Sequence, residues 1–160
     1  MRRELLLLAI AVVALYFGVQ QLDYHVNPWL NTVVTSGEAA AAEQFARGTP
    51  QDTVFMSDIF GGELVMGLAA RSAIIGGDWA ANPAAPRQMS DAQEFYKTAS
   101  ADRAAELMRK YNITYAVFPD RKLFCGYGWI DADESKMADP RFSIAFDATG
   151  VRVYALRSDT

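Results

Sequence analysis

The sequence predicts an α/β protein, with a small three-layer domain built on parallel core strands and ending in an antiparallel β-hairpin. Short apolar, β-prone runs alternate with helical patterns between residues 53 and 118, as in βαβ units. Two alternating runs then flank a turn at residues 147–150, which is typical of a hairpin. An uninterrupted apolar run at residues 5–19 lies before all of these and predicts an N-terminal transmembrane helix.

The apolar run covers only about 22 Å as a helix, against a bilayer core of about 30 Å. Extension through Leu22 makes a membrane span possible, and a secretory signal peptide is the alternative. No small-residue cleavage site follows the run, which favours an uncleaved anchor. We therefore expect a membrane anchor helix at residues 1–22, a linker at residues 23–37 and an α/β domain at residues 38–160.

Charges flanking the run predict its orientation. Arg2 and Arg3 precede it, and no Lys or Arg follows until Arg47. Positive charge stays on the cytoplasmic side of a membrane helix. We expect a single-pass protein with a cytoplasmic N-terminus and a periplasmic or extracellular domain.

The first half of the domain predicts a helix and one βαβ unit. An alanine-rich helix over 38–47 should begin near Ser36 or Gly37 and stop at the following Gly-Thr-Pro. Strands are expected at 53–57 and 72–75. Between them, Gly61 and Gly62 should form a turn that leads into a helix starting at Glu63.

The second half continues the alternation. Residues 78–86 contain two prolines and predict a loop. Serine caps predict helices from Ser90 to Lys97 and from Ser100 to Tyr111. The near-continuously apolar run 113–118 predicts a central parallel strand. An irregular region with one helical turn should follow, before hairpin strands at 142–146 and 151–156.

Composition limits the chemistry. A net charge of −4 disfavours a nucleic-acid partner, which would require clustered Lys and Arg. Cys125 and His25 are the single cysteine and histidine, so an intramolecular disulfide, an ordinary zinc site and a Ser-His-Asp or Cys-His catalytic set are not expected. The sequence predicts no catalytic residue, no metal and no cofactor.

A ligand site could still lie at the carboxyl ends of the predicted strands, where open α/β sheets bind ligands. Two carboxylates follow neighbouring strands, and the glycine pair could hold a phosphate at a helix N-terminus. Residues of these types more often cap helices or turns. The candidate ligand-binding residues are Ser57, Asp58, Gly61, Gly62 and Asp78.

Aromatic residues indicate a second kind of site. The segment LFCGYGWI is apolar enough to contact lipid or another subunit, and packing within its own loop is the alternative. A tryptophan after the anchor suits the membrane interface. The candidate partner-contact residues are Trp29, Leu123, Phe124, Tyr127 and Trp129.

Three stretches, EAAAAEQFARGTPQDTVFMSD, GGELVMGLAARSAIIGGDW and EFYKTASADRAAELMRKYNITYAVF, cover most of residues 38–118. Their order resembles the C-terminal extracytoplasmic domain of oligosaccharyltransferase-like multi-span membrane glycosyltransferases. That family's Trp-Trp-Asp-Tyr-Gly signature would fall near Ser57–Gly62, where this chain has Ser-Asp-Ile-Phe-Gly-Gly. Only Gly62 corresponds, so the residues that read the acceptor sequence are not carried over. The resemblance implies the accessory module without the catalytic, multi-helix part.

Together these observations predict a non-catalytic, single-pass accessory or recognition subunit. Its partners would be the bilayer, through residues 5–22, and other subunits of a larger, glycosyltransferase-related membrane complex. One alternative is a small-ligand-binding or metal-dependent enzyme using Asp58 and Asp78. Another is a docking subunit of a respiratory or photosynthetic membrane complex.

Overall fold

The computed structural model describes residues 2–25, 33–77 and 79–157, with side chains described from 7 to 20 and from 33 onward. The chain divides into two compact units, residues 1–33 and residues 34–160. Each unit is described by itself below.

The first unit contains a single helix, α1 (Arg2–His25). The described side chains of α1, residues 7–20, are all exposed, and most of them are large and apolar. Among the helices whose side chains are described, none combines the length and apolar character that a bilayer crossing requires. The helix is therefore confirmed, whereas the predicted transmembrane span is not supported by the structure.

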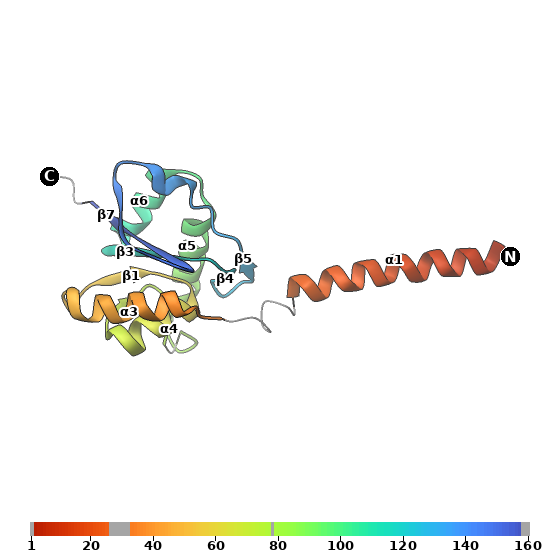
Figure 1. Cartoon of the computed structure of the whole chain (residues 1–160), viewed down its shortest axis with the longest axis horizontal. Helices are drawn as coiled ribbons and strands as arrows, with labels where there is room; N and C mark the ends of the chain where they lie inside the picture. The colour runs from red at the N-terminus through yellow and green to blue at the C-terminus, as the bar shows by residue number, and fades with distance from the viewer. Residues whose placement is uncertain (1, 26–32, 78, 158–160) are drawn as a thin grey trace. The chain divides into compact units, whose positions relative to one another are not determined.

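The second unit is built on a five-stranded sheet with the strand order β2–β1–β3–β7–β6 (Figure 1). The strands are β2 (Ser72–Ala73), β1 (Val54–Met56), β3 (Ile113–Pro119), β7 (Val151–Leu156) and β6 (Phe142–Ala148). The first three run parallel to one another, and β7 pairs antiparallel with both β3 and β6. The predicted parallel core and C-terminal hairpin are confirmed, and the hairpin extends the same sheet.

Alternation along the strands divides the core between the two faces of the sheet. Phe55 and Val117 belong to a cluster under α3 (Ser36–Gly48) and the π-helical turn η1 (Val65–Ala69). Their neighbours Met56 and Phe118 belong to a larger cluster under α5 (Ala85–Lys97) and α6 (Ala101–Lys110). Successive strand residues point to opposite faces, so helices cover both sides of the sheet (Figure 1).

The βαβ unit is confirmed, but the glycine pair does not form a turn. Helix α4 (Ile59–Leu64) begins before the glycines, because the Asp58 side chain accepts a hydrogen bond from the backbone N–H of Gly61 and caps the helix. A Cβ on Gly62 would lie 1.8 Å from the carbonyl oxygen of Ile75. Gly62 therefore allows close contact between α4 and the segment after β2.

Two helix starts also differ from the prediction. Helix α3 is capped by Thr35 in a capping box. The Thr35 hydroxyl accepts a hydrogen bond from the backbone N–H of Glu38, and the backbone N–H of Thr35 donates to the Glu38 carboxylate. Helix α5 begins at Ala85 and not near Ser90, because Pro86 lies in its first turn, where a missing N–H has no cost. The Ser100 cap of α6 is confirmed.

The region after β3 contains more structure than expected. A small two-stranded hairpin forms from β4 (Leu123–Phe124) and β5 (Trp129–Ile130). The single helical turn predicted beyond it is a 3-10 turn, η2 (Ser135–Ala138). The small hairpin carries the aromatic segment that the sequence singled out.

Candidate functional site

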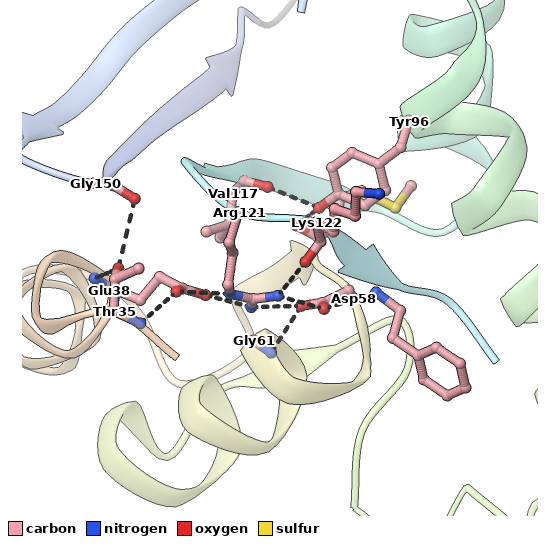
Figure 2. A network of polar contacts seen from close by, with 11 residues as sticks. Thr35, Glu38, Asp58, Gly61, Tyr96, Val117, Arg121, Lys122 and Gly150 are labelled. Atoms are coloured by element: carbon pink, nitrogen blue, oxygen red, sulfur yellow. Dashed lines mark hydrogen bonds and ion pairs between the residues drawn. The ribbon is translucent and has the colours of Figure 1, made fainter. Parts of the chain in front are cut away.

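Two charged side chains lie just beyond the carboxyl ends of neighbouring parallel strands. Asp58 follows β1, and Arg121 follows β3. Because β1 and β3 run in the same direction, their carboxyl ends lie at the same edge of the sheet. Glu38, in the first turn of α3, reaches the same place (Figure 2).

Arg121 joins the two carboxylates with four of its five N–H groups, and the fifth donates to a backbone carbonyl (Figure 2). Its Nη2 donates to Glu38 Oε1 at 2.6 Å and to Asp58 Oδ1 at 3.0 Å, and its Nε donates to Glu38 Oε2 at 3.0 Å. Its Nη1 donates to Asp58 Oδ2 at 2.8 Å and to the carbonyl of Lys122 at 3.0 Å. The guanidinium fork thus has no donor left for a ligand.

This cluster is removed from water, with side-chain exposures of 9% for Arg121 and 1% for each carboxylate. Burial alone would lower the pKa of Arg121, but its hydrogen bonds to Asp58 and Glu38 outweigh burial and raise that pKa further. The cluster keeps one excess negative charge, and backbone donors stabilise it. The N–H of Phe124 lies 3.1 Å from Asp58 Oδ2, and the N–H of Thr35 lies 2.8 Å from Glu38 Oε2.

The cluster connects four segments that are distant in sequence: the start of α3, the start of α4, the segment after β3, and β4. We call Glu38, Asp58 and Arg121 the strand-end lock. A buried ion pair with its hydrogen bonds satisfied holds a geometry in place. Chemically, the lock can orient these segments, but it presents no open carboxylate to a substrate.

A buried hydroxyl lies behind the lock. Tyr96 from α5 donates to the carbonyl oxygen of Val117 at 2.8 Å, and its hydroxyl is also within 3.2 Å of the carbonyl oxygen of Met56 (Figure 2). Burial raises the pKa values of Tyr96 and of the Cys125 thiol, so both groups stay protonated. Neither has the character of an activated nucleophile.

The structure places the candidate ligand residues as follows. Ser57 is buried, and its hydroxyl has no hydrogen-bond partner among the described residues. Asp58 belongs to the lock and occupies the N–H of Gly61, where an anion would otherwise bind. Gly62 is packed against Ile75. Asp78 lies outside the described residues, so the pairing of Asp58 with Asp78 stays a prediction.

The candidate partner-contact residues divide by exposure. Leu123 and Trp129 are buried, Phe124 is half-buried, and Tyr127 is exposed. The Trp129 ring stacks on Phe60 of α4, with their centroids 5.8 Å apart. Part of the aromatic segment therefore packs within the domain, and its tip faces solvent. Trp29 lies outside the described residues.

Sequence reasoning did not identify Arg121 or Glu38 as site residues. Arg121 follows the predicted strand 113–118 by three residues, and Asp58 comes directly after the predicted strand 53–57. Opposite charges at the ends of adjacent parallel strands are a usable indication of a contact. Glu38 gave no such indication, since an acidic residue in the first turn of a helix is common.

An open groove of about 610 Å³ borders the lock on the side of the β6–β7 turn. Its walls carry both charge signs, and across it Arg152 pairs with Glu134 at 2.8 Å. Among the residues that the structure describes, no three His, Cys, Asp or Glu side chains are grouped so as to hold a metal ion.

The comparisons with known proteins are limited to structure. No protein-family model matches the chain, and no curated protein sequence matches it. The crystal structure of the C-terminal globular domain of oligosaccharyltransferase from Archaeoglobus fulgidus is similar, with a TM-score of 0.60 and 13% sequence identity. The match covers 79% of this chain and 100% of that domain. The chain therefore has the fold of that domain, which confirms the resemblance at the level of fold.

Proposed function

We propose that this chain is a non-catalytic accessory or recognition subunit of a glycosyltransferase-related membrane complex. The observation that carries the proposal is the extent of the structural match, which spans the whole of an oligosaccharyltransferase globular domain. In that solved protein the domain is one part of a larger enzyme. Here the same fold follows helix α1 along the chain.

The strand-end lock supports a non-enzymatic role. An acid or base must reach the proton that it transfers, whereas Asp58 and Glu38 are buried and paired with Arg121. Cys125 is buried, with its pKa raised. The groups that catalysis would use are thus engaged in holding the domain together.

We further propose that α1 attaches the chain to a membrane, with the α/β domain on the periplasmic or extracellular side. Supporting this are the exposed apolar side chains of α1, such as Leu8, Leu15 and Phe17, which find no cover within their own unit. A row of this kind in water would promote aggregation. Lipid or a neighbouring membrane helix would satisfy it, and Arg2 and Arg3 favour a cytoplasmic N-terminus.

Affinity purification of the full chain from native membranes in mild detergent tests the proposal. We expect membrane proteins, glycosyltransferase subunits among them, to co-purify and to be identified by mass spectrometry. The matched controls are Leu15→Asp in α1 and Ile144→Asp on β6, two exposed apolar positions. Leu15→Asp should lose the membrane fraction and its companions, whereas Ile144→Asp should retain them. Recovery of respiratory or photosynthetic subunits instead would replace the glycosyltransferase assignment.

A further inference from the structure

The turn between α6 and β3 leads into the sequence Asn112-Ile113-Thr114. An asparagine followed two positions later by serine or threonine, with no proline between them, is the acceptor pattern for N-glycosylation. No other asparagine of the chain is followed in this way. The pattern is short, so its use depends on how the structure presents it.

The two residues that define the pattern are exposed, and the residue between them is buried. Asn112 and Thr114 are open to solvent, whereas Ile113 packs into the larger core cluster with 3% exposure. The hydrogen bonds and ion pairs among the described residues engage neither the Asn112 carboxamide nor the Thr114 hydroxyl. Ile113 therefore anchors the segment to the core, and both polar groups are left accessible.

Asn112 follows the end of helix α6. It has φ +54°, the left-handed conformation that asparagine adopts more readily than most residues and that often follows a helix. Its backbone N–H donates to the carbonyl oxygen of Arg109 at 3.1 Å, so the backbone holds the turn without the carboxamide. The helix end accounts for an asparagine at this position, but it does not require a hydroxyl two residues later.

Thr114 lies outside the regular pairing of the sheet. In the register of β3 with β1, Ile113 lies opposite Val54. The next pair is Tyr115 with Phe55, so Thr114 is passed over. The pairing of β3 with β7 begins only at Tyr115. A bulky group on the turn just before this irregularity would therefore displace no paired strand.

The turn lies at the other end of β3 from the strand-end lock. The strand begins at Ile113, next to the turn, and ends at Pro119, two residues before Arg121. A strand of seven residues is about 20 Å long. A saccharide on the turn would thus leave the lock uncovered, together with the groove that borders it.

We infer that Asn112 is an N-glycosylation site and that Thr114 is the second residue by which the transferring enzyme recognises it. The inference rests on the proposed periplasmic or extracellular location of the domain. The donor is a saccharide linked to a lipid phosphate, and the enzyme is an oligosaccharyltransferase.

The transfer changes one bond at each partner. Nδ2 of Asn112 forms a bond to the anomeric carbon of the saccharide, and the bond from that carbon to the phosphate oxygen breaks. The lipid phosphate leaves with the electron pair, and one amide proton passes to a base of the transferring enzyme. The exposed carboxamide can carry the product without any change in the core.

Mass spectrometry of the full chain, purified from the membranes of its own cells, tests the inference. We expect the tryptic peptide 111–121 to carry one saccharide. Asn112→Asp and Thr114→Val should abolish this addition, whereas Thr114→Ser should retain it. Aspartate tolerates the left-handed conformation, and valine keeps the β-branched shape of threonine, so both variants should fold.

A membrane-impermeant, amine-reactive label applied to intact spheroplasts separates the possible failures, because the exposed Lys97 reports the side on which the domain lies. Labelled Lys97 with an unmodified peptide 111–121 overturns the glycosylation site and leaves the proposed location in place. Lys97 that is labelled only after the membrane is dissolved overturns the location, and the glycosylation site with it. A saccharide that persists in Thr114→Val overturns the assignment to this acceptor pattern.

Discussion

At the scale of single residues, Arg121 is the side chain with the widest reach in this domain. It connects the cap of α3 to the cap of α4, and both to the segment that follows β3. Its two carboxylate partners are buried and would be left without a counter-charge if Arg121 were removed. Uncompensated buried charge is among the more destabilising changes that a single substitution can make.

We therefore expect Arg121→Leu to lower the free energy of unfolding by about 3–5 kcal/mol. Urea unfolding of the full chain in detergent micelles, followed by tryptophan fluorescence, measures this change. The matched control is Arg103→Leu. Arg103 of α6 pairs near the surface with Glu94 of α5 and Glu106 of α6, so its loss should change the unfolding midpoint little. Similar midpoints for the two variants would show that the lock does not hold the domain together.

Lys136 is a second buried charge, in the η2 turn. Its Nζ donates to the carbonyl oxygens of Tyr96 and Asp133 and lies 5.2 Å from the ring centroids of Phe95 and Phe118. Burial lowers the pKa of Lys136 to about 8. Below about pH 8 the folded protein must keep this ammonium group buried, and that costs stability.

The pH dependence follows from the sign of this shift. Between about pH 8 and about pH 10.5 the unfolded chain binds a proton at Lys136 that the folded chain does not, so rising pH favours folding at this group. The difference in stability between the parent chain and Lys136→Met should therefore shift by about 2 kcal/mol in favour of the parent between about pH 7 and about pH 9.5. Comparing the two chains cancels the tyrosine titrations that they share. A constant difference would mean that Lys136 titrates normally.

At the scale of elements, α4 lies in close contact with the segment after β2. Gly62 faces the backbone of Ile75, so a side chain there must push the helix and the segment after β2 apart. Five residues further along the chain, Gly67 lies in η1 with open space where its Cβ would be. The two glycines both lie in helical segments but have opposite surroundings.

Gly62→Ala should destabilise the domain by about 2–3 kcal/mol through overpacking. Gly67→Ala should be neutral or stabilise it by up to about 1 kcal/mol, because alanine loses less backbone entropy in a helical turn. Thermal unfolding followed by circular dichroism would rank the two variants. If Gly67→Ala were the more damaging one, the close contact of α4 with Ile75 would be wrong.

The elements that sequence could predict are those whose determinants are local. The apolar run ending at Phe118 and the serine cap at Ser100 both lie next to the element that they specify. The start of α5 was missed because Pro86 can either end a segment or open a helix, and only the packing of Met89 and Ala92 decides between them. The same ambiguity applies to Gly61 and Gly62.

The candidate site, in contrast to these elements, depends on residues that are distant from one another in sequence. Asp58 could be identified from its position after a strand. The other two members of the lock, Glu38 and Arg121, lie 20 positions before it and 63 positions after it in the chain. Charges that follow two parallel strands indicate a contact only once the strands are known to be neighbours, and a single sequence does not show which strands are neighbours. The pairing depends on strand order, which places β3 beside β1 and brings Arg121 to Asp58.

At the scale of the whole molecule, the sheet and its two helical layers form a body with its own core on each face. The polar groups at the strand ends are used within that body. Exposed apolar side chains lie on α1, and Tyr127 is exposed on the domain. The proposed accessory role rests on these features.

The mass of the native particle extracted in mild detergent tests this claim most directly. Native mass spectrometry should find the 17.6 kDa chain within a larger particle that contains at least one other membrane protein, in fixed stoichiometry. The Leu15→Asp chain, prepared in the same way, should be found alone. A parent chain that is extracted as a monodisperse single copy, with no companion, would contradict the accessory role.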